Sequence, residues 1–590
     1  MPPTTVNPSL EDVQLESQTT GAPAHRAALP GQPSRTRWIL PTALCMLFVA
    51  QCAWFINTQS LSNDEPLHMV AGLDAWRYHR FERWNDHPPL VFLLCALPLL
   101  LNHTELDIQP EAKYFDGIKP NPEAVAWAAR PVIVLLGVLL GVLLWITARR
   151  LFSEGAANFA LGLFAFSPSL IANFSITCND GAVALITFVT AMQVVYWKRT
   201  QSWGRTIALG LILGALLATK FSTPVLFALA LALVLILKPG GVSWKPQKWN
   251  WRKAIAMIAI AFVFVWGTYF FHWTKVSVKD GFVTVSSPNR TKAATGDMHR
   301  HLNLTMYLPA GEYVEGMGRV ANHLNLGHPT FFLGQVSVGK GWKSYFPVVV
   351  LLKWPTVVLA IFLTAIVLGF LKRIQFPPDL LIFSLFPALY FLLAIFSKVD
   401  LGERHILLVY PFALLYAAAL WHYARRRRAV LTLLVALVVA NAADTLRYAP
   451  GYLSYFNIFV NPATSYKLLS DSNLDWGQGL LALRKYQAEH PSETIHLAYF
   501  GTVDPSLYGI RYTPLAPNER VTGTVVVSAT HLSGQLLDDP NGYHWALQYP
   551  QTAILDHALH VFHVDNRTVE RHRGNEAIFV NAKNLRADSR

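Results

Sequence analysis

Charged residues are scarce in this sequence. Only 14% of its 590 residues are Asp, Glu, Lys or Arg, whereas soluble proteins carry about 25%. Hydrophobic residues, in contrast, make up 53% of the chain. The shortage of charge argues against a soluble protein of several domains, and the abundance of apolar residues indicates a chain that lies in a membrane.

Cysteine is also rare, and no two cysteines form a CxxC pair. The four present are Cys45, Cys52, Cys95 and Cys178. This pattern argues against a disulfide framework and against a cysteine zinc site. A glycine-rich nucleotide-binding loop is likewise not visible, so the sequence gives no sign of a nucleotide-linked substrate.

The net charge of +13 would point to nucleic acid if the protein were soluble. Here the basic residues cluster at the ends of apolar runs, which is the topology signal of a membrane protein. We therefore expect a membrane, and no nucleic acid, as the partner of these charges.

Apolar runs of about 17 to 25 residues recur along the chain, and each is long enough to cross a membrane as a helix. The run Pro88–Leu101 has about 14 residues, which is short for a span and typical of an interfacial or re-entrant helix. We expect a polytopic α-helical membrane protein with eleven spans: 38–57, 129–148, 156–173, 181–197, 205–220, 222–238, 254–272, 346–371, 380–397, 404–423 and 429–446.

The basic clusters predict the orientation of these spans. Arg149 and Arg150 follow the second span and Arg425–Arg428 follow the tenth, so with eleven spans such clusters all lie on the cytoplasmic side. The amino terminus is then cytoplasmic, and the carboxyl terminus lies outside.

Three regions differ in composition. Residues 1–36 are rich in Pro, Thr, Gln and Ala and predict a disordered cytoplasmic tail. Residues 37–446 hold the spans and two outer loops, 58–128 and 273–345. Residues 447–590 predict a small mixed α/β extracytoplasmic domain. Its expected elements are a helix near Gln478–Glu489 and strands that include Val521–Ser528 and Ala577–Val580.

Acidic residues follow two of the predicted membrane exits. Asp64 and Glu65 come after the first span, and Asp180 lies in the turn before the fourth. A carboxylate at the membrane surface can act as a general base, and two can hold a divalent metal, which the sequence leaves open for Asp64 and Asp180. The alternative is helix capping, with Ser62 as N-cap and Glu65 at N3, or with Asp180 as an N-cap.

Basic residues on the same outer side oppose the general charge bias. Arg130 opens the second span, Lys220 interrupts an apolar run, and Arg404 and His405 open the tenth span. An ionisable residue in or beside a span is costly, and several together predict an anion site suited to phosphate. For Lys220 the alternative is that its amine extends to the membrane surface.

Further candidate residues are aromatic or lie in unusual motifs. His87 and Tyr345 are the expected residues of a substrate cavity. The alternatives are that His87-Pro88-Pro89 is a rigid start of a helix and that Tyr345 is an interface anchor. The segment Asp471–Gln478 has the spacing of acids seen in calcium loops, but its sixth and twelfth positions are not Gly and Glu, so we reject a calcium site.

Taken in order, these motifs resemble the C-type (GT-C) membrane glycosyltransferases, close to the protein-O-mannosyltransferases and aminoarabinose transferases (glycosyltransferase family 39-like). The resemblance spans about residues 38–480 and includes the segment Asp471–Gln478, which is similar to one in bacterial phospholipid-carrier-dependent members. The other motifs are Asp64-Glu65, His87-Pro88-Pro89-Leu90, Ala129-Arg130-Pro131, Ser167-Pro168 to Asp180, Gly341-Trp342 with Tyr345-Phe346-Pro347, and Gly402-Glu403-Arg404-His405 before Tyr410-Pro411.

The resemblance implies that a sugar moves from a polyprenyl-phosphate donor to a hydroxyl of a protein, lipid or glycan acceptor, on the outer face of a bacterial plasma membrane. It implies Asp64 as the base and Glu65 and Asp180 as its helpers. Lys220, Arg404, His405 and Arg130 would bind the donor phosphate. The alternative functions are a transporter or flippase of lipid-linked sugars, which also needs such cations, and a scaffold that uses the carboxyl-terminal domain.

Overall fold

The computed structural model describes residues 35–81, 85–109, 112–238, 241–242, 250–279, 282–287, 290–294 and 304–565. Nearly all of the expected amino-terminal tail and the expected strand Ala577–Val580 lie outside these residues.

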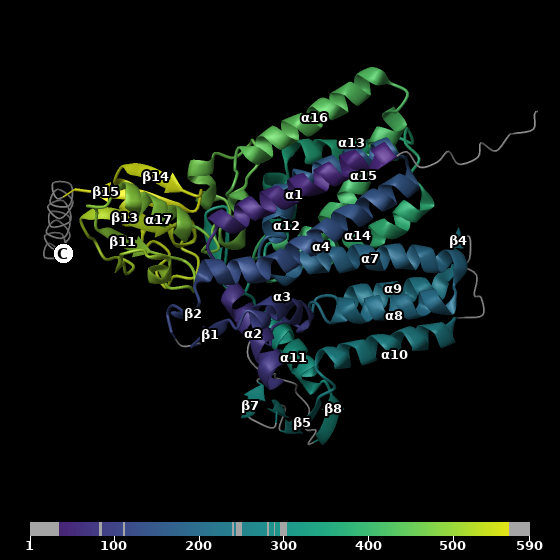
Figure 1. The fold of residues 1–590 in the computed structure, drawn as a ribbon, viewed down its shortest axis with the longest axis horizontal. Helices are drawn as coiled ribbons and strands as arrows, with labels where there is room; N and C mark the ends of the chain where they lie inside the picture. Colours follow the sequence, from purple (N-terminus) through teal and green to yellow (C-terminus); the bar gives the residue numbers. More distant parts are fainter. Residues whose placement is uncertain are drawn as a thin grey trace, which may run out of the picture.

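Long apolar helices form the body of the protein (Figure 1). Within the described residues, seven helices are long and apolar enough to cross a membrane, or eight if one bent pair is a single span. The chain is thus a polytopic helical membrane protein, and eleven spans remain a prediction. The seven are α1 (Ile39–Thr58), α4 (Pro122–Leu151), α7 (Asn179–Thr200), α10 (Trp251–Thr268), α14 (Pro378–Ile395), η2 with α15 (Glu403–Val409 and Tyr410–Ala424) and α16 (Arg428–Leu446).

Shorter helices fill the spaces between these spans and build the outer parts. Three of them, α3, α8 and α9, are strongly apolar. The α-helices are α2 (Glu65–Tyr78), α3 (Leu90–Leu101), α5 (Glu154–Ala165), α6 (Pro168–Asn173), α8 (Trp203–Leu217), α9 (Pro224–Ile236), α11 (Gly311–Leu326), α12 (Tyr345–Lys353), α13 (Thr356–Phe370), α17 (Leu480–Glu489) and α18 (Ala529–Leu532). The 3₁₀ helices are η1 (Arg35–Trp38), η3 (Tyr452–Ser454), η4 (Pro462–Lys467), η5 (Asp471–Asn473), η6 (Pro505–Tyr508) and η7 (His544–Gln548).

The expected span 346–371 is bent, because the chain turns by 117° between α12 and α13, and whether the pair forms a single span stays a prediction. Pro355 lies at the break, and a residue before proline is forced out of the helical region; Trp354 is accordingly extended. The carbonyls freed at the break are satisfied by Asn457, whose side-chain amide donates to Leu351 O at 2.6 Å and to Trp354 O at 3.1 Å. A break of this kind is tolerated in a membrane helix only where such partners exist.

The expected span 156–173 is also divided, into α5 and α6, at Ser167-Pro168. The carbonyl of Phe166 accepts hydrogen bonds from Asn441 at 2.7 Å and from Thr445 at 2.8 Å, both on α16. The proline again ends the helix, and a neighbouring helix satisfies the free carbonyl.

Strands occur in four parts of the described chain. They are β1 (Glu105–Asp107), β2 (Gly117–Lys119), β3 (Leu237–Lys238), β4 (Gly241–Val242), β5 (Trp273–Lys279), β6 (Phe282–Ser287), β7 (Arg290–Ala294), β8 (Leu304–Pro309), β9 (Thr330–Phe332), β10 (Gln335–Ser337), β11 (Ile495–Ala498), β12 (Thr513–Pro514), β13 (Gly523–Ser528), β14 (Gln551–Leu555) and β15 (Leu559–Val564).

The carboxyl-terminal strands form a five-stranded mixed sheet of order β12-β11-β13-β15-β14 at one end of the helices (left in Figure 1). Its central strand, β13, pairs in parallel with β11 and antiparallel with β15. The central strand is buried from Thr524 to Ser528, which explains its run of three valines. The expected helix near Gln478–Glu489 is α17, and the expected strand Val521–Ser528 is β13.

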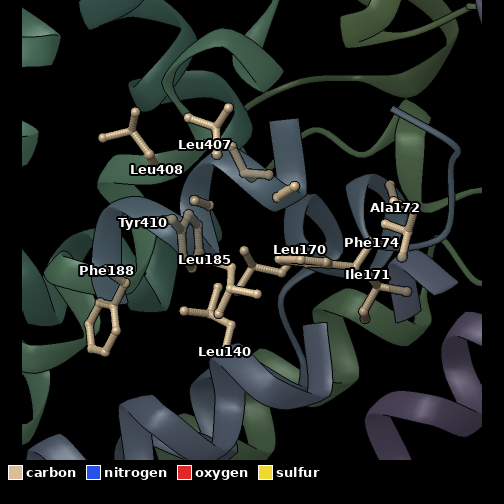
Figure 2. Packing of buried hydrophobic residues seen from close by; sticks show 14 of the residues in the cluster. Leu140, Leu170, Ile171, Ala172, Phe174, Leu185, Phe188, Leu407, Leu408 and Tyr410 are labelled. Carbon is tan, nitrogen blue, oxygen red and sulfur yellow. The ribbon is translucent and has the colours of Figure 1, made fainter. Parts of the chain in front are cut away.

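The core between the helices is close-packed. Between membrane helices, stability comes from such packing rather than from transfer of side chains out of water. At Gly137 of α4, a Cβ atom would lie only 2.8 Å from the ring of Phe174, so glycine permits the close approach. Figure 2 shows the part of this core where α4, α6, α7 and η2–α15 meet, with Leu140, Leu170, Leu185, Leu407 and Tyr410.

Backbone hydrogen bonds attach the carboxyl-terminal part to the first outer loop. Ser60 N donates to Gln478 O at 2.9 Å, and Asn63 N donates to Trp476 O at 2.8 Å. The segment Asp471–Gln478 therefore lies directly beside Asp64, although more than 400 residues separate the two in the sequence.

Candidate functional site

A cavity of about 930 Å³ lies where the outer ends of the helices meet the carboxyl-terminal part. Its apolar wall comes from α9, α11 and α14 and includes Val225, Met317, Val320 and Leu393. Its polar wall comes from segments that are distant in sequence: Asp64, His87, Lys220, Arg404, His405 and Asp471. The cavity thus combines a charged part with a hydrophobic part, which suits an amphiphilic ligand.

Alternating charges connect four separate elements at the polar wall. Lys220, after α8, donates to Asp180 in the first turn of α7 at 2.5 Å. Arg404 in η2 lies 3.6 Å from Asp180 and 3.6 Å from Asp64. Because buried charges are stable only when paired, each of these residues depends on the others for its position.

The guanidinium of Arg404 is held in a fixed orientation. Its Nε donates to Ser472 Oγ at 3.0 Å, and its Cζ lies over the Trp476 ring, 4.1 Å from the ring centre. Gly402 permits this approach: its φ is +139°, and a Cβ there would lie 2.5 Å from Ser472 Oγ. Two of its remaining nitrogens face the acids, so the residue can present a planar cation to an anion in the cavity.

Asp64 is the acid of the Asp-Glu pair that faces the cavity. Its side chain is 20% exposed, and it accepts a hydrogen bond from Asn63 Nδ2 at 3.0 Å. Asp64 occupies the N-cap position of α2, but its carboxylate makes no capping hydrogen bond. The carboxylate therefore remains available for chemistry in the cavity.

Only one of the two hydrogen bonds of the expected capping box is formed, the one that Glu65 accepts. Its carboxylate accepts from Ser62 N at 2.7 Å, but Ser62 Oγ has no partner among the described residues. Glu65 also accepts from Thr177 N at 2.7 Å. It thus joins the start of α2 to the turn that precedes α7.

The expected roles of Glu65 as a helper and of Arg130 as a phosphate ligand do not agree with the structure. Both side chains are fully buried and neither lines the cavity. Arg130 donates from Nε and Nη2 to Glu65, at 2.9 and 2.7 Å, and to the carbonyls of Gln59 and Ser60. Burial alone would raise the pKa of Glu65, but the charge and hydrogen bonds of Arg130 lower it below its ordinary value. The pair joins the start of α2 to α4.

Tyr345, an expected cavity residue, is also placed elsewhere. It is buried against Phe332 and Phe346, and its hydroxyl accepts from Asn473 Nδ2 at 3.0 Å. It does not line the cavity. An aromatic residue at the start of a helix can line a cavity or pack against neighbouring rings, and the sequence does not distinguish these two positions.

The two histidines expected at the site both line the cavity. His87 Nδ1 and His405 Nε2 are buried and lack a hydrogen-bond partner within the described part of the chain. Burial, aided by the charge of Lys220, holds the pKa of His87 well below its ordinary value, so the ring is neutral at physiological pH. A buried nitrogen without a protein partner keeps the capacity for one more hydrogen bond.

A metal at Asp64 and Asp180, which the sequence leaves open, finds no further ligands. Among the residues that the structure describes, no group of three or more His, Cys, Asp and Glu side chains could hold a metal ion. Both acids also face Arg404, and this positive charge opposes a divalent cation. The charge arrangement favours an anion.

Sequence reasoning did not place the carboxyl-terminal part at this wall. Asp471, Trp476 and Phe500 reach the cavity from the carboxyl-terminal part. The segment Asp471–Gln478 is visible as a motif, but its sequence contains no signal that places it beside Asp64 and Arg404.

The chain was compared with known proteins. Residues 123–266 match the family model of dolichyl-phosphate-mannose-protein mannosyltransferases. The matched segment runs from α4 to α10 and includes Asp180 and Lys220. No curated protein matches the chain.

Several solved structures are similar to the chain. ArnT from Cupriavidus metallidurans bound to undecaprenyl phosphate has 12% identity and a TM-score of 0.43, and the match covers 90% of this chain and 98% of that one. The protein O-mannosyltransferase Pmt1-Pmt2 complex of S. cerevisiae bound to the sugar donor has 11% identity and a TM-score of 0.43, covering 82% and 94%. Both TM-scores lie below 0.5. The resemblance to the C-type membrane glycosyltransferases is shown by the family model, over residues 123–266.

Proposed function

We propose that the protein is an integral membrane glycosyltransferase. It transfers a sugar from a polyprenyl-phosphate donor to an acceptor hydroxyl on the extracytoplasmic side of the membrane. One observation carries the proposal: an uncapped carboxylate, Asp64, lies beside the buried cation Arg404 in a cavity with an apolar wall.

The phosphate of the donor binds to Lys220 and Arg404. Both line the cavity, and both are paired with Asp180, which does not line it. Asp180 is thus a positioning residue that keeps the two cations together in the absence of donor. His405 lies next to them with a free ring nitrogen and can add a hydrogen bond to the phosphate.

The lipid chain of the donor lies along the apolar wall formed by α9, α11 and α14. Val225, Met317 and Leu393 come from these three helices. An isoprenoid chain has no polar groups, so it is compatible with such a wall and not with the charged part of the cavity. This division orients the donor with its phosphate toward Arg404.

Asp64 takes the proton of the acceptor hydroxyl as its oxygen attacks the anomeric carbon. A new bond forms between this oxygen and the anomeric carbon, and the bond from that carbon to the phosphate oxygen breaks. The electron pair leaves with the polyprenyl phosphate, whose growing charge Lys220 and Arg404 stabilise. A single displacement of this kind inverts the anomeric configuration.

The family model supports the choice of donor, because its members are described as using dolichyl-phosphate mannose. A long-chain polyprenyl phosphate is the feature that fits the cavity. The acceptor is a protein, lipid or glycan hydroxyl that reaches the cavity from the outer side.

The test is a transfer assay in vesicles with radiolabelled polyprenyl-phosphate sugars. The wild type should cleave one of these donors and label an acceptor. Asp64→Asn should lower turnover at least about 100-fold, the lower limit for loss of a general base, while still binding the donor. Asp116→Asn, an exposed residue of the same outer loop, is the matched control and should keep wild-type turnover.

Two results would contradict the proposal. Near-normal turnover of Asp64→Asn would leave the residue with no chemical role. Movement of the labelled lipid across the membrane without cleavage of the sugar–phosphate bond would instead indicate a flippase.

A further inference from the structure

Asp471 is an acid of the cavity wall that the transfer reaction, as described so far, does not use. It lies at the start of η5 with its side chain lining the cavity, and only 7% of the residue is exposed. It belongs to the same short segment as Ser472 and Trp476, which hold Arg404. Its position is therefore tied to that of the proposed phosphate site.

The backbone of Asp471 is in an unusual conformation. Its φ is +57°, a left-handed value that is uncommon outside glycine and that Asp and Asn adopt more readily than most other residues. The amide of Asp471 donates to Thr530 Oγ1 at 3.2 Å, and Asp475 N donates to its carbonyl at 2.9 Å. The surrounding fold thus holds the residue in this conformation at the edge of the cavity.

The carboxylate is only partly satisfied by the protein. Oδ1 accepts from Ser472 N at 2.5 Å, whereas Oδ2 has one long contact, 3.4 Å from Gln535 Nε2. A carboxylate can accept about four hydrogen bonds. A buried acid with free acceptor capacity beside a cavity is suited to bind hydroxyl groups.

We propose that Asp471 accepts hydrogen bonds from hydroxyl groups of the sugar that is transferred, and so determines which sugar the site accepts. The inference rests on the proposed function and adds the sugar subsite to it. Lys220 and Arg404 hold the phosphate, Asp64 faces the acceptor, and the sugar lies between the phosphate and the segment Asp471–Gln478.

The chemistry of Asp471 separates it from the other ligands of the cavity. A carboxylate repels the donor phosphate, so Asp471 does not belong to the anion site. The apolar wall binds the lipid without hydrogen bonds. The neutral ring of His87, whose Nδ1 is free, is a second group that can bind a sugar hydroxyl in the same cavity.

The experiment measures binding of four lipids to the purified protein in detergent: undecaprenyl phosphate without a sugar, and its mannose, glucose and aminoarabinose forms. The wild type should prefer one sugar form. Asp471→Asn keeps a residue type that tolerates a left-handed φ. This variant should weaken binding of the preferred sugar form about 10- to 100-fold, as expected for loss of hydrogen bonds to a charged group. Its affinity for undecaprenyl phosphate without a sugar should stay within about twofold of the wild-type value.

Asp475→Asn is the matched control. Asp475 lies four residues further on, and its carboxylate accepts from Gly477 N and Thr530 N at 3.2 Å each, away from the cavity. It should show the wild-type preference among the four lipids. A second measurement compares the preferred donor with its monodeoxy forms. In the wild type, one monodeoxy form should bind about 10-fold more weakly than the parent donor, whereas Asp471→Asn should bind that form and the parent donor equally.

The outcomes separate the hypotheses. An unchanged sugar preference in Asp471→Asn would overturn the role of Asp471 and leave the proposed function intact. Equal loss of bare and sugar-bearing lipids, in both Asp471→Asn and Asp475→Asn, would show that Asp471 only shapes its segment. A wild-type protein that binds none of the four lipids would overturn the proposed function, and the sugar subsite with it.

Discussion

Replacing Glu65 with Gln tests whether this residue stabilises the fold or takes part in the chemistry. The structure gives the carboxylate four hydrogen-bond donors, namely Arg130 Nε, Arg130 Nη2, Ser62 N and Thr177 N. The single amide oxygen of Gln can accept about two. Its NH₂ group then faces donors, and the charge of the fully buried Arg130 is no longer compensated.

Removing one partner of a buried ion pair costs about 3–5 kcal/mol. We therefore expect Glu65→Gln to lower the free energy of unfolding by that amount, which is a large part of the stability of a typical domain. The measurement is thermal and denaturant unfolding in detergent, followed by tryptophan fluorescence. Any folded fraction should still bind donor lipid, because neither Glu65 nor Arg130 lines the cavity.

Glu123→Gln is the matched control. Glu123 also pairs with an arginine, Arg484, at 2.6 Å, but both side chains are partly exposed, so the loss should be at most about 1 kcal/mol. The double variant Glu65→Leu with Arg130→Met removes both buried charges and should be more stable than Glu65→Gln. Wild-type stability of Glu65→Gln combined with a loss of turnover would refute the structural role and restore Glu65 as a direct participant.

Three further predictions concern the cavity and the carboxyl-terminal part. Lys220→Gln and Arg404→Gln should each weaken the binding of bare undecaprenyl phosphate about 10- to 100-fold. The control Lys119→Ala changes an exposed lysine and should leave this affinity unchanged. Unaltered affinity in both cavity variants would exclude Lys220 and Arg404 as phosphate ligands. Val225→Trp adds a large side chain at the apolar wall, so it should weaken the binding of undecaprenyl phosphate more than the binding of a short-chain prenyl phosphate. Ile258→Trp, on the exposed face of α10, should not have this effect. Equal losses of affinity for both lipids would refute this placement of the lipid chain. Burial raises the pKa values of Asp475 and Asp556 to about 7, so the folded state favours their protonated forms and their contribution to stability declines as pH rises from about 4 to 7. The melting temperature of the double variant Asp475→Asn with Asp556→Asn, relative to wild type, should therefore increase across that pH range. A difference in melting temperature that stays constant with pH would contradict the raised pKa values.

Sequence reasoning identified the cavity acid Asp64 and the cations Lys220 and Arg404 for a physical reason. Each is an ionisable residue beside an apolar run, where its cost makes it conspicuous. Asp180 was found by the same argument, although the structure places it behind the cations rather than in the cavity. The same cost drew attention to Arg130, but a buried charge can be retained for pairing alone, and the sequence does not reveal its partner.

Local sequence by itself determined most helices of the membrane part, because apolar length is a property of consecutive residues and each helix satisfies its own backbone. Tertiary structure alone decided which charges meet. Arg130 and Glu65 are 65 positions apart, and Arg404 and Cys178, next to Asp180, are 226 apart. It also brought Asp471 to the cavity, through the attachment of residues 476–478 to the first outer loop. Such contacts depend on how distant segments pack, and no local period or composition encodes that packing.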